Sequence, residues 1–337
     1  MKYATEKSLA IALALGCLLL QAHAEAAKTP VKNLTVTGDV RLMYVNYTSK
    51  YDGAKYGAYF KNLRNRINVN YQIDKNTTAT IGVYENRYFN AHENDRRAYI
   101  ARGNISGQYS KFGYTLGRME HEGVDEFVLE ATHLDGVKLR FGPRTKYVET
   151  FVGNISRNSE GQHPSGFYVK GVQHWKHWTG KTAFYEFTDE DKVTPWNHQK
   201  IWSNLVAYRF DSKNSLSYER LNAWGEDYGA KAERQSGYVM LYRWNNLDLS
   251  RPNTLYVSAG YVHQPQGSFL RGNHAAMAAV DSFSNLGAEG FKGPALYVGY
   301  TLAKNTLLNF EAYDLRNIYG STKHKQRTLA AYLNFFY

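Results

Sequence analysis

Arginine and lysine recur at alternate positions in several short segments of the chain. Arg64 and Arg66 are separated by one residue, Lys138 and Arg140 have the same spacing, and Arg41 lies in an earlier segment. In a β-strand, residues two apart share one face, so each pair would project its charges in one direction. Guanidinium groups suit carboxylates and phosphates, and rows of Arg and Lys along a narrow aqueous passage favour anions. These residues therefore predict electrostatic attraction of small anions.

The elements that must carry these charges are predicted to be β-strands. From residue 34 onward, apolar and polar residues alternate in about sixteen segments, and no helical period competes. The first segment places Leu34, Val36, Val40, Leu42 and Tyr44 on one face, against Thr35, Thr37, Asp39 and Arg41 on the other. The sequence therefore predicts an all-β fold in which most strands have one apolar and one polar face. Three segments are ambiguous in parity, residues 182–188, 215–222 and 236–245.

The links between these segments alternate between long and short. By our segmentation they run roughly 11, 4, 9, 2, 14, 3, 10, 4, 10, 4, 13, 8, 30, 3 and 12 residues. This asymmetry is typical of an outer-membrane barrel, with short periplasmic turns and longer external loops. In the last segment Leu333, Phe335 and Tyr337 share one face, and the sequence ends on an aromatic residue. We expect this strand to pair with the first one, and these three residues to form a C-terminal assembly signal.

Composition excludes several other classes of protein. The chain has 337 residues, of which 15% are aromatic, and a formal net charge of +11. The mean hydropathy of −0.54 argues against a bundle of membrane helices, and the longest apolar run, residues 9–20, is too short to span a bilayer. Because every backbone polar group must be paired inside a membrane, a closed barrel remains. A soluble β-sandwich would also alternate, but the link asymmetry and the aromatic last strand favour the barrel.

The first residues are predicted to be a targeting segment. Lys2 and Lys7 precede the apolar run, and Ala-His-Ala at residues 22–24 supplies a small-residue cleavage site. We expect a signal peptide over residues 1–24, a short periplasmic segment over residues 25–33 and the barrel over residues 34–337. The sole cysteine, Cys17, would be removed with the signal peptide. Neither disulfides nor thiolate chemistry would then remain in the exported protein.

Several short motifs, taken in order, resemble those of the Gram-negative outer-membrane porins. Gly-Asp-Val-Arg-Leu at residues 38–42 is similar to the family's first strand, and residues 107–118 resemble its glycine-rich hairpin ending in Gly-Arg. Residues 134–139 are similar to the strand after the third loop, and Phe336-Tyr337 to the aromatic terminus. The resemblance implies an antiparallel up-and-down barrel of about sixteen strands, assembled as a homotrimer. The segmentation alone leaves about fourteen to eighteen strands open.

The two loops that could narrow the passage differ from the family pattern. The resemblance implies a long third loop that folds into the barrel, with carboxylates facing a basic cluster. Here residues 119–132 are acidic but short, and we expect this loop to be too short to narrow the passage alone. Its candidate constriction carboxylates are Glu120, Glu122, Asp125 and Glu126. In the long seventh loop, Asn273 and the helix formers after it suggest that residues 273–286 fold inward; an external lid or a subunit latch are the alternatives.

If the apolar faces meet lipid, the basic residues line the interior, because a lipid-facing Arg or Lys costs ~2–4 kcal/mol at the membrane midplane. The predicted pore-lining and selectivity residues are Arg41, Arg64, Arg66, Arg102, Arg118, Lys138 and Arg140. Alternation would point Arg118 outward with Phe112. A bulge at Gly117 would re-aim it, and the family resemblance implies a pore-lining role. For all these residues the alternative is that they only hydrate and brace the wall.

Other chemistries have weak support. His174 and His177 lie on opposite faces of a strand, so we interpret them with Trp178 as an interfacial aromatic belt rather than a metal site. The sequence has no Gly-rich phosphate loop or nucleophile elbow, and we expect neither an enzyme nor a cofactor. The basic residues are spread over many strands, which argues against nucleic-acid binding.

The function predicted from the sequence is that of an outer-membrane porin, a water-filled channel for passive diffusion of small hydrophilic solutes that prefers anions. Its expected surroundings are outer-membrane lipid and lipopolysaccharide, with the barrel-assembly machinery as a partner during biogenesis. Two alternatives stay open: a substrate-selective channel for an anionic nutrient, and a plugged barrel that acts as an adhesin or structural anchor.

Overall fold

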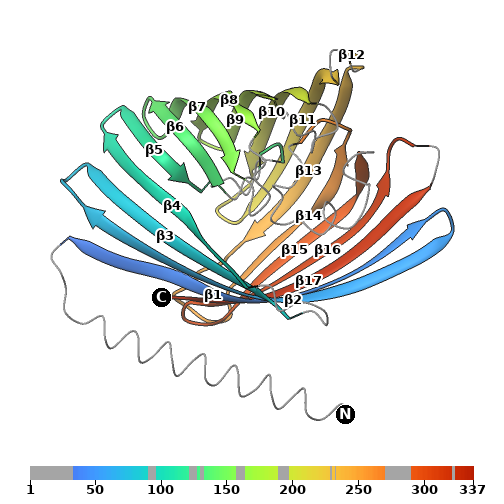
Figure 1. Ribbon diagram of the computed structural model, residues 1–337, viewed down its shortest axis with the longest axis horizontal. Coiled ribbons are helices and arrows are strands. Elements are labelled where there is room, and N and C mark those ends of the chain that lie inside the picture. The colour runs from blue at the N-terminus through green and yellow to red at the C-terminus, as the bar shows by residue number, and fades with distance from the viewer. Residues whose placement is uncertain are drawn as a thin grey trace, which may run out of the picture.

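The protein forms one closed antiparallel β-barrel (Figure 1). The computed structural model describes residues 33–89, 96–120, 127–129, 133–156, 164–188, 197–227, 230–231, 233–269, 290–320 and 323–337. The strands are β1 (Leu34–Tyr51), β2 (Ala54–Gln72), β3 (Thr77–Tyr88), β4 (Arg96–Tyr109), β5 (Phe112–Met119), β6 (His133–Phe141), β7 (Lys146–Ser156), β8 (Ser165–Trp175), β9 (Trp178–Thr188), β10 (His198–Arg209), β11 (Asn214–Asp227), β12 (Ala230–Lys231), β13 (Gln235–Asn245), β14 (Leu255–Gln264), β15 (Phe291–Ala303), β16 (Thr306–Asn317) and β17 (His324–Phe336). β12 is a two-residue strand paired only with the end of β11, so sixteen strands build the wall. No helix in the described part of the chain is long and apolar enough to cross a membrane.

The last strand closes the barrel by pairing with the first. β17 runs antiparallel to β1 from Asp39↔Phe336 to Tyr51↔His324, and Figure 1 shows the C-terminus beside β1. The backbones of Gly38 and Tyr337 exchange two hydrogen bonds of 3.0 Å. Along β17 the predicted alternation is confirmed: Leu329 is 63% exposed on the outer face, whereas Tyr332 and Asn334 are buried on the inner one. The terminal aromatic residue therefore completes the ladder that leaves the sheet without an edge.

The first link is shorter than the sequence analysis predicts. Instead of about eleven residues, only Asp52 and Gly53 connect β1 to β2. Both have positive φ, 48° and 80°, which is the backbone of a type I′ hairpin turn and suits Asp-Gly. Because this turn is tight, β1 and β2 extend to 18 and 19 residues. The later links keep the predicted alternation of short turns and longer loops as far as β11. The alternation is lost once, where the link before β14, residues 246–254, is longer than the link before β13, residues 228–234.

The outer surface carries a band of exposed aromatic side chains beside the short turns. Trp175 and Trp178 flank one turn and are 53% and 49% exposed, and Tyr109 and Phe112 flank another. The Trp178 ring packs against Tyr208, with 4.6 Å between centroids. Rings placed at the two ends of tilted strands form the aromatic girdle of a membrane barrel. This placement fits the interpretation of Trp178 as part of an interfacial belt.

The inner surface differs from the prediction over much of the barrel. From β7 to β16 the inward side chains nearest the long links are apolar and fully or nearly buried, although the sequence analysis assigns polar residues to this face. The main members are Phe151, Ile155, Tyr168, Tyr185, Phe187, Ile201, Leu221, Val239, Leu241, Val262, Phe291 and Leu315. Toward the long links these strands are therefore largely apolar on both faces, whereas nearer the short turns their inner face carries buried polar residues such as Lys170, Glu219 and Glu311. The protein has a hydrophobic core inside the barrel, and we call this cluster the lumen core.

Candidate channel constriction

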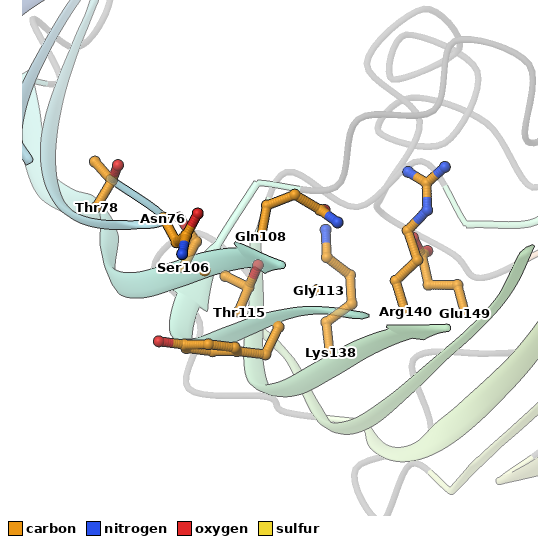
Figure 2. Close-up of a pocket in the computed structure, with 11 residues that line it drawn as sticks. Asn76, Thr78, Ser106, Gln108, Gly113, Thr115, Lys138, Arg140 and Glu149 are labelled. Carbon is orange, nitrogen blue, oxygen red and sulfur yellow. The ribbon is translucent and has the colours of Figure 1, made fainter. Parts of the chain in front are cut away.

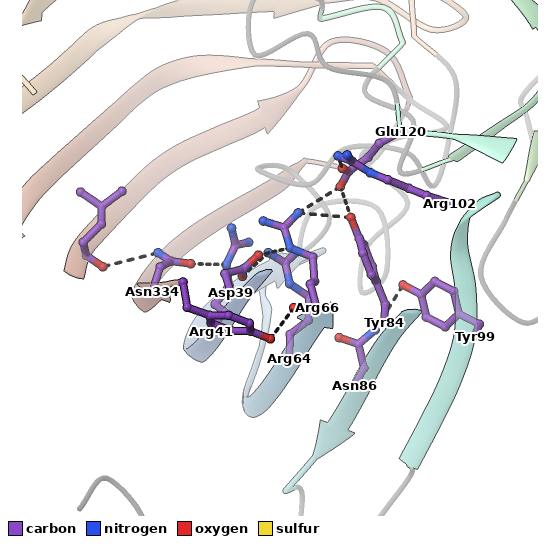
Figure 3. A network of polar contacts seen from close by, with 12 residues as sticks. Asp39, Arg41, Arg64, Arg66, Tyr84, Asn86, Tyr99, Arg102, Glu120 and Asn334 are labelled. Atoms are coloured by element: carbon purple, nitrogen blue, oxygen red, sulfur yellow. Dashed lines mark hydrogen bonds and ion pairs between the residues drawn. The ribbon is translucent and has the colours of Figure 1, made fainter. Parts of the chain in front are cut away.

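The opposite part of the wall, from β1 to β4, is basic. Arg41 of β1 and Arg64 and Arg66 of β2 lie on the inner face, together with Arg102 of β4 (Figure 3). Strict alternation explains the first three: Ile67 and Val69 are 41% and 37% exposed on the outer face. Side chains that alternate with these residues must point inward.

A local irregularity brings Arg102 to the same face. The pairing of β3 with β4 shifts between Gly82 and Val83, so that Gly82 faces Arg102 but Val83 faces Ile100. The extra residue, Ala101, reverses the phase of the strand. A Cβ at Gly82 would lie 3.0 Å from the Cβ of Arg102. A larger residue at this position would crowd the side chains of Asn68 and Arg102, and glycine leaves them room beside β3.

Two carboxylates, the buried Asp39 and the partly buried Glu120, organise these arginines. Asp39 is 2% exposed and accepts hydrogen bonds from Arg66 Nε and, at 3.3 Å, from Arg64 Nη2. Arg66 Nη1 also donates to Glu120 Oε1 at 3.0 Å, and Arg102 forms an ion pair with the other oxygen of Glu120. Figure 3 shows Arg66 between the two carboxylates. We call these six residues, Asp39, Arg41, Arg64, Arg66, Arg102 and Glu120, the constriction network; its four guanidinium groups face two carboxylates, leaving two positive charges in excess.

Two partners of this network are residues that the sequence analysis missed. Tyr84 donates a 2.6 Å hydrogen bond to Glu120 Oε1, and the guanidinium of Arg66 lies 5.3 Å from the centroid of its ring. Arg41 donates to the amide oxygen of Asn334 at 2.6 Å. The sequence indicated only that Tyr84 and Asn334 point inward, because both residues alternate with apolar residues that point outward. A tyrosine in such a chain suggests the interfacial girdle first.

The described residues of the third loop lie inside the barrel; whether the loop narrows the passage alone stays a prediction. Glu120 follows directly after β5, and Val128 and Leu129 are completely buried in the lumen core. The Gln264 side chain of β14 donates to the Phe127 carbonyl at 2.7 Å. The loop is thus fixed to the basic wall at one point and to β14 at another. Glu122, Asp125 and Glu126 lie outside the described residues.

The seventh loop also begins inside the barrel. Gly267, Ser268 and Phe269 are buried, and the Gln199 side chain of β10 donates to the carbonyl oxygens of Gly267 and Phe269, the latter at 2.8 Å. The Phe269 ring packs on Phe291 with 5.2 Å between centroids. This agrees with an inward course at the start of the loop. Residues 273–286, the predicted inward segment, lie outside the described residues.

The remaining predicted site residues are placed apart from the network. Arg118 makes an ion pair with Asp135 at 2.7 Å, and alternation carries it to the outer face, because Leu116 is exposed and Met119 is buried in the lumen core. Gly117 does have positive φ, 107°, but it does not re-aim Arg118. The inward prediction for Arg118 is therefore wrong. Lys138 and Arg140 point inward near the short turns, where they line a separate cavity.

The comparisons with known proteins match this architecture. The outer membrane channel DcaP of Acinetobacter baumannii superposes with a TM-score of 0.58 at 12% identity, covering 90% of this chain and 97% of that one. OmpF of Salmonella typhi, solved with daunomycin, gives 0.59 at 10% identity with the same coverage. A variant of Rh. blastica porin gives 0.52 at 8% identity, covering 90% and 100%. The chain has the porin fold.

At these identities the similarity to porins is one of fold. No family model matches the chain, and no curated protein matches it. The resemblance of the short motifs is thus confirmed at the level of architecture, whereas the constriction network is defined by this chain's own residues.

The contacts of Glu120 predict how the ion selectivity of the protein depends on pH. Burial alone would raise the pKa of Glu120, but Arg102, Tyr84 and Arg66 outweigh it and hold the pKa below its ordinary value of 4.5. The stabilisation from these contacts is complete above that value and is lost as the pH falls through the lowered pKa. We expect the ion selectivity of the reconstituted protein to stay constant from about pH 7 to pH 5 and to shift toward anions only below 4.5.

The matched control is Glu120→Gln, which cannot ionise. Its selectivity should already lie on the anion side at neutral pH and should change less on acidification than that of the unsubstituted protein. A selectivity shift centred well above pH 5 in the unsubstituted protein would contradict the pairing of Glu120 with Arg66 and Arg102.

Proposed function

We propose that the protein is an outer-membrane channel through which small hydrophilic solutes diffuse passively, with a preference for anions. The observation that carries the proposal is the constriction network: four arginines and two carboxylates on the inner wall of a closed barrel, beside a loop that enters the barrel. Diffusion through such a channel needs neither catalytic turnover nor a cofactor.

Selectivity follows from the excess of positive charge. In a narrow channel with low-dielectric walls, field lines are focused and the local concentration of counter-ions rises. Asp39 and Glu120 neutralise part of the charge and hold the guanidinium groups in place. Small anions are therefore enriched beside β1 and β2, and cations are depleted there, without a step that consumes energy.

The outer surface supports placement in a membrane. Leu329, Ile81 and Val152 are at least 60% exposed, which would be unfavourable in water but suits contact with lipid chains. We propose that residues 1–24 direct export and are cleaved, that the barrel-assembly machinery inserts the chain beside lipopolysaccharide, and that the protein is a homotrimer. Leu333, Phe335 and Tyr337 keep their proposed role as the assembly signal.

The lumen core supports a second candidate, a plugged barrel that serves as an anchor. The buried apolar cluster from β7 to β16, with Val128, Leu129 and Phe269 packed into it, fills interior space that an open pore leaves to water. A passage would then be confined to the basic side of the barrel. Measured conductance decides between the two candidates.

The experiment uses the protein purified from the outer membrane of a Gram-negative host and reconstituted in a planar bilayer. We expect stepwise conductance increases in potassium chloride, since the basic side of the lumen is lined by charged and polar groups. Saturable block of this current by one anionic solute would instead identify a substrate-selective channel. A folded protein that inserts and gives no steps would establish the anchor and overturn the channel.

A further inference from the structure

A second basic region lies at the end of the barrel where the short turns are. It surrounds a cavity of about 320 Å³, lined among others by Asn76, Ser106, Gln108, Thr115, Lys138 and Arg140. Asn76 ends one short turn and Gln108 lies in β4 close to the next short turn, so the cavity opens at the proposed periplasmic mouth. Its volume is at the lower end of the ~300–1,000 Å³ typical of small-molecule sites. The lining offers hydroxyl and amide groups around two cations.

The two cations share one face of one strand. Lys138 and Arg140 are two residues apart on β6, which separates their Cα atoms by about 7 Å. Figure 2 shows both side chains rising from the strand into the same space. The guanidinium of Arg140 lies over the Tyr147 ring, 3.5 Å from its centroid. Stacking restrains the guanidinium plane, and its hydrogen-bond donors remain directed at the edges of that plane.

The one carboxylate among the described cavity residues is already engaged. Glu149 faces Arg140 across the β6–β7 pair, yet its Oε1 accepts from Lys170 Nζ at 3.1 Å and from the Tyr168 hydroxyl at 2.9 Å. In Figure 2 the Arg140 side chain extends past Glu149. Glu149 is thus bound to Lys170 and Tyr168, and it interacts with Lys138 only through the electrostatic attraction of their charges. The cavity keeps one more cation than carboxylate.

We infer that this cavity binds a small dianion, one whose two negative charges can be met by Lys138 and Arg140 together. Arg140 would bind one carboxylate or phosphate edge with two parallel hydrogen bonds, and Lys138 would act as a point charge for the second. Hydroxyl groups of Ser106 and Thr115 would donate to the remaining oxygens. Only the role of this site, retention of a dianion at the periplasmic mouth of the channel, rests on the proposed function. Binding of the dianion does not require the barrel to conduct.

The test is calorimetric titration of the folded full-length protein in detergent with succinate and, separately, inorganic phosphate, at low salt and neutral pH. We expect saturable binding of at least one dianion that Arg140→Gln and Lys138→Gln each weaken by about tenfold. Lys138→Arg should retain binding. The matched control is Arg144→Gln, which removes one exposed positive charge from the neighbouring turn and should change the affinity less than twofold.

The outcomes separate this inference from the proposed function. Binding that depends on Lys138 and Arg140 in a protein without conductance would uphold the site and overturn the channel. Conductance without saturable dianion binding, or binding that Arg144→Gln weakens as much as Arg140→Gln, would overturn the site. Preference for phosphate over succinate, or the reverse, identifies which dianion the spacing of the two cations fits.

Discussion

A protein in which Arg64 and Arg66 are both replaced by glutamine is expected to lose its preference for anions. The two substitutions leave Arg41 and Arg102 against Asp39 and Glu120, so the constriction network changes from an excess of two positive charges to neutrality. The selectivity, measured as the reversal potential in a potassium chloride gradient, should move from the chloride side to near zero. The change should be largest at low ionic strength, where charges are least screened.

The same substitutions should lower stability, because Asp39 is 2% exposed and loses both of its arginine partners. Removing one partner of a buried ion pair destabilises by about 3–5 kcal/mol. The loss is measured as a lower temperature for the change in gel mobility that accompanies barrel unfolding. Adding Asp39→Asn to the double variant should restore part of the stability and return the selectivity to the anion side.

A matched control removes two charges outside the lumen. Arg144 and Lys213 are exposed residues of short turns, and their replacement by glutamine should leave the reversal potential nearly unchanged. If this control shifted selectivity as much as the Arg64 and Arg66 double variant, the total charge of the protein would govern selectivity and the network would not.

The second large effect is expected from Leu129→Asp in the third loop. Leu129 is completely buried in the lumen core, and a carboxylate without a partner in such a site costs several kcal/mol. The buried part of the loop should therefore leave the core and no longer occupy the lumen. We expect the unit conductance to rise by about twofold or more, because the passage widens.

Leu129→Met serves as the control for this variant. It keeps the side chain apolar and close in volume, which usually costs less than about 1.5 kcal/mol, so the conductance should equal that of the unsubstituted protein. An unchanged conductance in Leu129→Asp, with the barrel shown to be folded, would mean that the third loop does not limit the passage.

Regular alternation made much of the basic wall predictable from the sequence. Arg41, Arg64 and Arg66 lie in strands whose outward neighbours are aliphatic, so parity alone fixed their direction. Arg102 lies on the same face, although no pattern in the sequence marked the irregularity at Ala101 that puts it there. Arg118 was predicted to point inward because a β-bulge was expected at Gly117. Gly117 has positive φ, but the β4–β5 pairing contains no extra residue there. Only an extra residue moves the side chains that follow it to the other face of the strand.

The lumen core could not be predicted for a physical reason. In β9, β10 and β13 both parities are apolar: Phe184 lies beside Tyr185, Trp202 beside Ile201, and Met240 beside Leu241. Period-two alternation distinguishes the two faces only when one is polar. In the segments of ambiguous parity, one apolar face packs in the lumen core and the other lies on the outer surface. Strands with two apolar faces were therefore the sequence feature that indicated an apolar interior.

The alternation of apolar and polar residues also could not predict where the third and seventh loops lie. Their inward position depends on contacts between residues far apart in sequence, Gln264 with Phe127 and Gln199 with Phe269. Gln264 is the last residue of β14 and Gln199 is the second residue of β10, and polar side chains are common at such strand ends. The same applies to Tyr84, whose hydrogen bond to Glu120 depends on how β3 meets the end of β5.

The reversal potential of the unsubstituted protein reports directly whether the basic side of the lumen conducts and selects for anions. The protein is reconstituted in a planar bilayer at neutral pH, with potassium chloride about tenfold more concentrated on one side. We expect stepwise conductance with a reversal potential on the chloride side. A potential on the potassium side would mean that carboxylates dominate the passage, and it would contradict the assignment of Arg41, Arg64, Arg66 and Arg102 as the residues that set selectivity.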